Sequence, residues 1–307
     1  MKFSNLIEIA GTRAVSRAKF LYPVARSVIG VSDSARLSKI ARQKSPVFVV
    51  YSQGRVGSTA IYNALLKSDL GMPLFHLHTL SSSGADEMIA NHRRKGQVVE
   101  RNHLLSRKIA RVFEELDPEA DHSQRWKVLS IFRDPLAIML SLKMKHATQD
   151  LRMFEEGSNS TADFDPMVSH VRASFEKDDP YNWEVARWMD TVLPSELGLD
   201  PFSEPFDHSK GYQIIQSGRF DLAILKFENM AKNFRACVED LVGHEVPDLK
   251  LVYDNVHRDR QFDEAHKYLK ENLKLPRAFC ERMYSTPVSE KLYSEEDRLA
   301  LIKKWSD

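Results

Sequence analysis

A glycine-bracketed arginine follows an apolar run in the first quarter of the chain. The run Val47–Tyr51 has the length and composition of a buried strand. A few positions after it come, in order, Gly54, Arg55, Val56, Gly57, Ser58 and Thr59. Glycines let a backbone approach a ligand closely, and the free N–H groups and dipole at a helix N-terminus attract an anion. Residues 52–59 therefore predict an anion-binding loop between a strand and a helix, with a phosphate or sulfate group as its ligand.

The position of the basic residue argues against triphosphate hydrolysis. The loop of kinases and GTPases ends in Gly-Lys-Ser/Thr, whereas here the basic residue precedes the second glycine, as Arg55-Val56-Gly57. No strand that ends in aspartate clearly supplies a magnesium site. A P-loop kinase is therefore an alternative that the sequence disfavours.

A second anion site is expected after a later strand. Arg133 follows the predicted strand Trp126–Phe132, and Ser141 comes eight residues later, on a predicted helix that begins at Pro135. Because the carboxyl ends of parallel strands meet at one edge of a sheet, Arg133 is expected near the anion loop. A guanidinium and a hydroxyl so placed can bind a second phosphate. Asp134 as the N-cap of the helix explains the Arg-Asp-Pro triplet equally well.

Together, the two sites resemble those of the sulfotransferases that use 3′-phosphoadenosine 5′-phosphosulfate (PAPS). In that family a basic residue stands two positions before Gly-Ser/Thr-Thr in the 5′-phosphosulfate loop, and an arginine followed eight residues later by a serine binds the 3′-phosphate. The resemblance implies PAPS as co-substrate and no metal. It implies that residues 54–59 hold the 5′-phosphate, that Arg55 binds the bridging oxygen of the leaving nucleotide, and that Arg133 and Ser141 hold the 3′-phosphate.

The resemblance covers residues 46 to about 243 and also implies the fold. It includes the run Asp221–Met230, which is similar to the family's later strand that ends in an acidic residue, and more weakly residues 292–296 and Trp305. The implied fold is α/β, a three-layer sandwich with a central parallel β-sheet of the P-loop-containing nucleotide hydrolase-like (sulfotransferase) type. No clear Arg-Lys-Gly loop stands near the C-terminus. Carbohydrate-type members often lack that loop, so its absence favours a sugar acceptor.

A further stretch resembles proteins of one pathway. Residues from Trp183 to Tyr212 are similar to bacterial sulfotransferase-like proteins described as capsular polysaccharide synthesis proteins. The implied function is transfer of a sulfuryl group from PAPS to an acceptor hydroxyl of a carbohydrate or glycolipid. A non-catalytic protein of capsule assembly that binds nucleotide or acts as a scaffold is the alternative.

Transfer to a hydroxyl needs a general base, and two histidines are candidates. His76 and His78 lie at the end of the predicted strand 73–77 and point the same way, because side chains in a strand repeat every two residues. Histidine is the side chain whose unperturbed pKa lies nearest neutrality. His78, which is closer to the ligand edge, is preferred as the base. His103 and His146 are weaker candidates, and two histidines without a third ligand do not argue strongly for zinc.

The alternation of strand and helix patterns predicts how these residues are positioned. Strands are expected at residues 47–51, 73–77, 126–132, 212–216 and 222–227. Helices are expected at 58–67, 85–94, 102–116, 135–146, 181–193 and 229–242, followed by a helical tail from residue 262. Residues 147–179 are expected to form a polar excursion over the surface. Such alternation is typical of a parallel sheet with helices on both faces.

Composition sets the outer limits. The chain has 307 residues, a formal net charge of +1 and 42% hydrophobic residues, which is typical of a globular protein and argues against a nucleic-acid partner. Residues 45–307 are expected to form one α/β domain. Cys237 and Cys280 lack metal-ligand spacing, which favours core thiols in a reducing compartment.

Residues 1–44 form a separate basic segment with nine Lys or Arg against two acidic residues, a net charge of +7. Two interpretations stay open for this largely helical arm. It packs on the domain with a solvated basic face, or it lies as a peripheral contact on the anionic inner face of a membrane. Without a run long enough to span a bilayer or a signal sequence, a cytoplasmic location is expected. The oligomeric state is not predicted.

Overall fold

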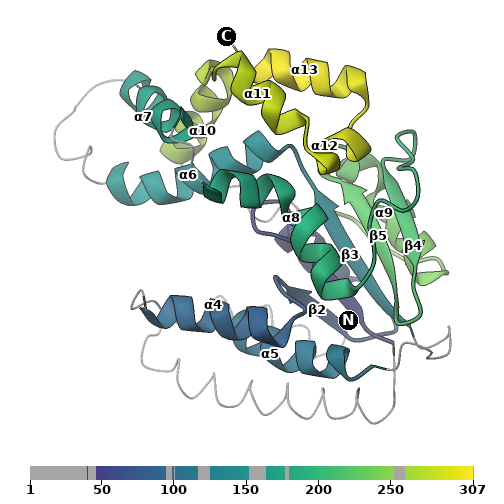
Figure 1. Ribbon diagram of the computed structural model, residues 1–307. Helices are drawn as coiled ribbons and strands as arrows, with labels where there is room; N and C mark the ends of the chain where they lie inside the picture. The colour runs from purple at the N-terminus through teal and green to yellow at the C-terminus, as the bar shows by residue number, and fades with distance from the viewer. Residues whose placement is uncertain are drawn as a thin grey trace.

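A five-stranded sheet with the strand order β2-β1-β3-β5-β4 forms the centre of the protein (Figure 1). The computed structural model describes residues 40, 46–94, 99, 101–116, 125–151, 164–176, 180–251 and 260–306. The strands are β1 (Phe48–Tyr51), β2 (Leu74–Leu77), β3 (Trp126–Phe132), β4 (Tyr212–Gln216) and β5 (Phe220–Lys226). The α/β class and all five predicted strands are confirmed, with bounds that agree to within two residues.

The prediction of a parallel sheet is wrong for one strand. Strands β2, β1, β3 and β5 pair in parallel, but β4 pairs with β5 antiparallel. Only residues 217–219 join β4 to β5, and the Ser217 N–H donates to the Phe220 carbonyl at 2.9 Å. A connection this short makes a hairpin, because parallel neighbours need a crossover of a dozen or more residues. The antiparallel strand lies at the sheet edge and leaves the ligand edge of the parallel strands unchanged.

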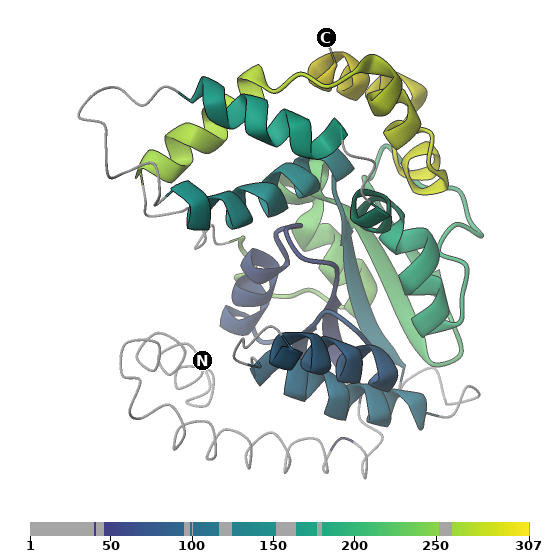
Figure 2. The same ribbon diagram turned by 60° about the vertical axis from the view of Figure 1, so that its left-hand side comes forward.

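The helices follow the strands in the expected alternation (Figures 1 and 2). After β1 and β2 come α3 (Ser58–Lys67), α4 (Ser82–Arg94) and α5 (Arg101–Glu114). After β3 come α6 (Pro135–Leu151), α7 (Asp165–Glu176) and α8 (Pro180–Leu197). After β5, a 3-10 turn (Phe227–Asn229) leads to α9 (Met230–Val242), α10 (Arg260–Asn272), α11 (Arg277–Tyr284), α12 (Pro287–Leu292) and α13 (Glu295–Trp305).

Two hydrophobic cores, one on each face of the sheet, give three layers. Phe48 and Val50 of β1 belong to one core, together with residues of α3, α6, α9 and the C-terminal helices. Val49 and Tyr51 belong to the other core, with residues of α5, α8 and α12. The alternation along β1 follows from the two-residue period of a strand. Cys237 and Cys280 form no disulfide and are buried, as expected for core thiols.

The polar excursion predicted for residues 147–179 is wrong in part. Helix α6 continues to Leu151, and α7 occupies residues 165–176. Met167, Val171 and Phe175 of α7 are buried at a spacing of four residues, which is the apolar stripe of an amphipathic helix. That stripe is narrow and lies among polar residues, so its pattern is weak. Helix α8 likewise runs past its predicted end at Leu193, through Pro194 to Leu197.

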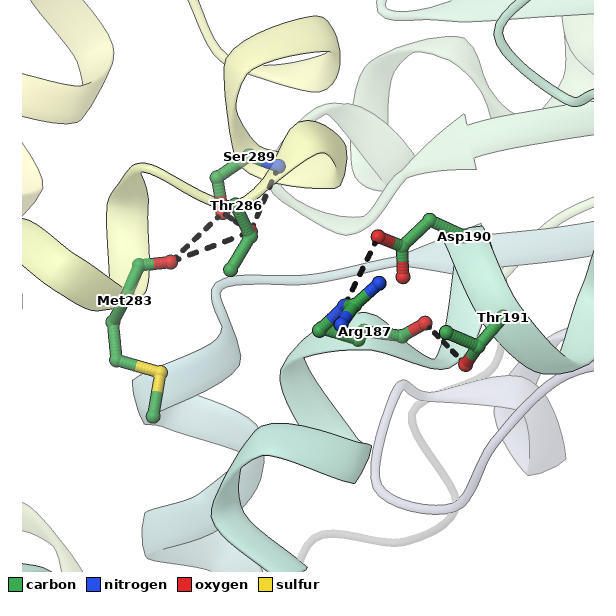
Figure 3. Close-up of polar contacts among 6 residues, drawn as sticks. All are labelled: Arg187, Asp190, Thr191, Met283, Thr286 and Ser289. Carbon is green, nitrogen blue, oxygen red and sulfur yellow. Dashed lines mark hydrogen bonds and ion pairs between the residues drawn. The ribbon is translucent and has the colours of Figure 1, made fainter. Parts of the chain in front are cut away.

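The C-terminal helices cover one end of the sheet, beyond the carboxyl ends of β3 and β5 (Figure 1). Thr286 caps α12, because its hydroxyl accepts from the Ser289 N–H at 3.3 Å (Figure 3). The hydroxyls of Thr286 and Ser289 both donate to the Met283 carbonyl. Nearby on α8, Arg187 pairs with Asp190 at 3.3 Å (Figure 3). Helix α12 thus packs against α8 and completes the second core.

The order of the strands creates a switch point beside β1. The chain passes from β1 outward to β2 and then crosses to β3 on the other side of β1. In open α/β sheets the crevice at such a reversal, at the carboxyl ends of the strands, is where ligands bind. The segments after β1 and β3 therefore lie where this fold class binds its ligands.

Two expectations lie wholly or almost wholly outside this description. Of the basic segment 1–44, only Ile40 is among the described residues, so its helical arm and its membrane contact remain predictions. The described helices include none with the length and apolar character to cross a bilayer.

Candidate functional site

The predicted anion loop lies between β1 and α3 at the switch point. Gly57 is the N-cap of α3 with a φ of 79°, and a Cβ there would lie 2.8 Å from Cε2 of Phe227. Within the described part of the chain, no side chain caps α3, and the Ala60 N–H donates to the Gly57 carbonyl at 3.0 Å. The N–H groups of Ser58 and Thr59 come before the helix ladder and have no helix carbonyl to bind. They supply the donors that an anion at a helix N-terminus uses.

Arg55 combines a strained backbone with an uncompensated charge. Its φ is 68°, which for a residue with a Cβ costs about 1–2 kcal/mol and is typical of functional loops. Its side chain is half-buried, and burial alone lowers the pKa of its guanidinium. Among the described residues, Arg55 has no acidic partner. A cation withdrawn from water in this way favours binding of an anion to the loop.

Arg133 connects the two predicted anion sites. It follows β3 directly, and its Nη1 donates to the backbone carbonyl of Arg55 at 2.7 Å. Its Cζ lies 4.4 Å from the ring centroid of Phe227, the residue that also crowds Gly57. Burial lowers the pKa of the Arg133 guanidinium, and the neighbouring Asp134 carboxylate opposes that shift. The expectation that Arg133 lies beside the anion loop is confirmed.

Ser141 lies on α6 and is not joined to Arg133 by a hydrogen bond among the described residues. It is half-buried on the second turn of α6, the helix that Arg133 precedes. Its part in a phosphate site stays a prediction.

Asp134 ties the C-terminal helices to the end of β3. Its Oδ1 accepts from the Leu136 N–H at 3.0 Å, which confirms it as a helix cap, and from the Tyr284 hydroxyl at 2.7 Å. Its Oδ2 accepts from Trp305 Nε1 at 2.8 Å. Glu228, just after β5, accepts from the Asp134 N–H at 3.0 Å. The turn that carries Arg133 is therefore held from the 3-10 turn after β5, from α11 and from α13 at once.

One ring nitrogen of His78 is held in a hydrogen bond, and no partner for the other lies among the described residues. Its Nδ1 lies 2.7 Å from the backbone carbonyl oxygen of Ser52, at the start of the anion loop. Because a carbonyl oxygen only accepts, Nδ1 carries the hydrogen, and the lone pair of the neutral ring is at Nε2. The residue is half-buried beside the loop. In this tautomer Nε2 is the nitrogen that can accept a proton, as a general base for a hydroxyl must.

His76 is placed differently from His78. It is 9% exposed, and its Nε2 lies 2.9 Å from the Ser58 hydroxyl. Its ring stacks on Tyr62 at 5.4 Å between centroids. Burial and the neighbouring His78 lower the pKa of His76 to about 3. A histidine with so low a pKa is a weak base near neutral pH, which favours His78 over His76 in the role of base.

Two lysines add positive charge near Arg133, and sequence reasoning did not find them. The Lys304 Nζ lies 3.7 Å from Asp134 Oδ2. The pKa of Lys270 is lowered by desolvation and by the charges of Arg133 and Lys304. Both lysines are exposed on helices far along the chain, where nothing in the local pattern distinguishes them from other surface lysines. An anion bound close to Arg133 would relieve the repulsion among these cations.

The weaker candidates lie elsewhere or outside the description. His103 is buried on α5, with its ring 4.3 Å from that of His92 of α4, so it belongs to the packing of these two helices. The side chain of His146 is outside the described residues. The described residues contain no group of three or more His, Cys, Asp or Glu side chains placed to hold a metal ion.

One family model matches part of the chain. Residues 161–294 match the NKWYS family, described as "Putative capsular polysaccharide synthesis protein". The matched segment contains β4, β5 and most of the C-terminal helices, with Phe227, Glu228 and Tyr284, while the anion loop and Arg133 precede it. No curated protein and no solved structure matches the chain. The comparisons therefore indicate similarity to a capsular polysaccharide synthesis family over this segment.

Proposed function

We propose that the protein is a sulfotransferase that moves a sulfuryl group from PAPS to a hydroxyl of a carbohydrate or glycolipid acceptor in capsular polysaccharide synthesis. The observation that carries the proposal is the bond from Arg133 Nη1 to the Arg55 carbonyl, which joins two cationic strand ends at the switch point of the sheet. A nucleotide with phosphates at both its 5′ and 3′ ends needs two such sites. The similarity of residues 161–294 to the capsular family supports the choice of acceptor.

The residues divide the reaction between them. The first N–H groups of α3 and the cation of Arg55 stabilise the charge that develops on the 5′-phosphate oxygen as its bond to sulfur breaks. Arg133 neutralises the 3′-phosphate and holds the nucleotide in register. The neutral His78 takes the acceptor proton at Nε2 as the acceptor oxygen bonds to sulfur. Adenosine 3′,5′-bisphosphate and the sulfate ester are the products. Positioning and electrostatic stabilisation supply most of the rate in such transfers.

Nucleotide preference is the first test. Calorimetric titration and thermal shift should show tight binding of adenosine 3′,5′-bisphosphate and weak binding of ADP and ATP, because a ligand that binds only the native state raises the melting temperature. Equal shifts by the three nucleotides would remove the 3′-phosphate site from the proposal.

Product formation is the second test. Cells with and without the gene are compared by mass spectrometry for sulfate esters on capsular sugars, and purified protein is incubated with labelled PAPS and polysaccharide fractions. A sulfated product that disappears with the gene supports the enzyme. Specific binding of adenosine 3′,5′-bisphosphate without any sulfated product would instead support the non-catalytic nucleotide-binding alternative.

A further inference from the structure

His76 of β2 and His78, which directly follows that strand, contact opposite ends of the anion loop. His78 binds the carbonyl of Ser52, the first residue after β1, and His76 binds the hydroxyl of Ser58, the first residue of α3. Their ring centroids lie 5.1 Å apart. Because β1 and β2 pair in parallel with Val50 opposite His76, the strand register sets both contacts. The loop is therefore held at its beginning and its end by side chains from the end of β2 and the position that follows it.

The bond between His76 and Ser58 is enclosed and uses one ring nitrogen. His76 is 9% exposed and Ser58 is 4% exposed, and 2.9 Å separates Nε2 from Oγ. The pKa of about 3, set by burial and by His78, keeps the His76 ring neutral at physiological pH. A neutral ring carries one hydrogen, at Nε2 or at Nδ1. The direction of the bond therefore depends on which tautomer is present.

The two tautomers give the Ser58 hydroxyl opposite properties toward an anion. If Nε2 is bare, Ser58 donates its hydrogen to His76 and turns lone pairs toward the loop. If Nε2 carries the hydrogen, Ser58 accepts from His76, and its own hydrogen is free to point toward the loop. Phosphate and sulfate oxygens in the loop only accept, so the second arrangement adds a hydrogen bond to a charged group where the first adds repulsion.

We propose that His76 is a positioning residue: as a neutral ring with its hydrogen on Nε2, it turns the Ser58 hydroxyl into a directed donor for the anion in the loop. His76 then acts without touching the ligand, and the role differs from that of a base or of a cationic ligand. The proposal rests on the proposed function only in requiring an anion in the loop. It gives the two histidines different tasks, with His76 preparing the anion site and His78 receiving the acceptor proton.

The tautomer can be observed directly in the unmodified protein. Nitrogen-15 histidine labelling and two-bond proton–nitrogen correlation spectra assign the protonated nitrogen of each ring, with His76→Gln used to assign the His76 signals. In the presence of adenosine 3′,5′-bisphosphate, and separately of inorganic pyrophosphate, His76 should show a protonated Nε2 and a bare Nδ1. A protonated Nδ1 with the anion bound would overturn the proposal.

A double-mutant cycle measures the coupling. His76→Leu and Ser58→Ala should each weaken anion binding about tenfold, and the double variant should bind no more weakly than the worse single variant, because both changes remove the same donor. His76→Gln, whose amide nitrogen also donates, should bind within about threefold of the parent. Losses that multiply in the double variant, or a Gln variant as weak as Leu, would contradict the role.

The design separates this inference from the proposed function. If pyrophosphate binds and shows the coupling but the 3′-phosphorylated nucleotide is not preferred, the sulfotransferase assignment fails and the role of His76 stands. If the 3′-phosphorylated nucleotide is preferred but the losses of the two single variants multiply in the double variant, the role of His76 fails and the sulfotransferase assignment stands. If neither anion binds the loop, both proposals are overturned.

Discussion

Arg133 donates a hydrogen bond from Nη1 to the backbone carbonyl of Arg55 across a distance of 2.7 Å. The bond joins the segment after β3 to the loop after β1, at the reversal of strand order. The bond also helps to hold the strained backbone of Arg55 in place. An unfavourable φ persists only where neighbouring contacts hold it. One side chain thus supports the loop of Arg55, and its charge would form part of the proposed 3′-phosphate site.

Replacing Arg133 tests whether it recognises a 3′-phosphate. Arg133→Ala should reduce the ratio of affinities for adenosine 3′,5′-bisphosphate and adenosine 5′-phosphate to about one, because only the former presents the group that the guanidinium binds. Isothermal titration of both nucleotides gives the ratio. Loosening of the Arg55 loop would weaken both nucleotides alike and leave the ratio unchanged. A parental ratio in the variant would therefore contradict the assignment.

Gly57 is required on two counts. Gly57→Ala adds a Cβ at a φ of 79° and 2.8 Å from Phe227, so we expect a loss of more than about 2 kcal/mol in unfolding free energy and loss of anion binding. Gly71→Ala is the matched control, since its φ is 68° but a Cβ there meets nothing within 4 Å. It should cost about 1 kcal/mol and leave anion binding intact. Urea denaturation and pyrophosphate titration report the two quantities, and equal effects of the two substitutions would rule out the role of close packing.

Local sequence patterns predict those parts of the site that consist of a single strand and the turn after it. The bounds of α3 and β3 agree with the prediction at every residue. The start of α3 is marked by Gly57-Ser58, and the end of β3 is marked where its apolar run meets Asp134-Pro135. The meeting of Arg55 and Arg133 follows from parallel pairing alone. The tautomer of His78 does not follow, because it depends on which carbonyl its ring reaches.

Contacts over long sequence separations explain what the sequence could not show. Asp134 accepts hydrogen bonds from Tyr284 and Trp305, which lie 150 and 171 residues away in the sequence. Asp134 is predicted as a helix cap, but nothing in its own neighbourhood indicates that its second oxygen binds an indole. Lys270 and Lys304 are likewise ordinary surface lysines until helices α10 and α13 place them near Arg133.

Asp134→Asn tests the attachment of the C-terminal helices. In the variant an amide nitrogen, which cannot accept a hydrogen bond, replaces one of the two carboxylate oxygens that accept from Tyr284 and Trp305. One buried donor therefore loses its partner, at a cost of about 3 kcal/mol in unfolding free energy. Tyr284→Phe removes a single hydroxyl and should cost about 1 kcal/mol. Hydrogen exchange should be faster in α11 and α13 of the Asn variant than in β1. A variant as stable as the parent would show that the carboxylate is not needed.

The low pKa of His76 predicts a dependence of stability on pH. The folded-state pKa of about 3 lies below the unfolded value of about 6.5, so the unfolded state binds more protons between these values. The contribution is complete above pH 6.5 and is lost as the pH falls toward 3, by about 1.4 kcal/mol per pH unit. His76→Gln should remove this slope, whereas His170→Gln on the exposed face of α7 should retain it. Urea titrations from pH 7 to pH 4 measure the difference between variants, and parallel curves for the parent and His76→Gln would refute the buried neutral ring.

Lys270 and Lys304 are predicted to strengthen binding of a 3′-phosphorylated nucleotide. The double variant Lys270→Ala, Lys304→Ala should lower the affinity for adenosine 3′,5′-bisphosphate about tenfold and make it less sensitive to salt, because two cations near Arg133 no longer attract the ligand. The control replaces Lys267 and Lys303, two exposed lysines of the same helices, and so removes the same charge. If net charge were the cause, both double variants would lose affinity equally. A loss confined to Lys270 and Lys304 would show that the C-terminal helices contribute to the site through these two positions.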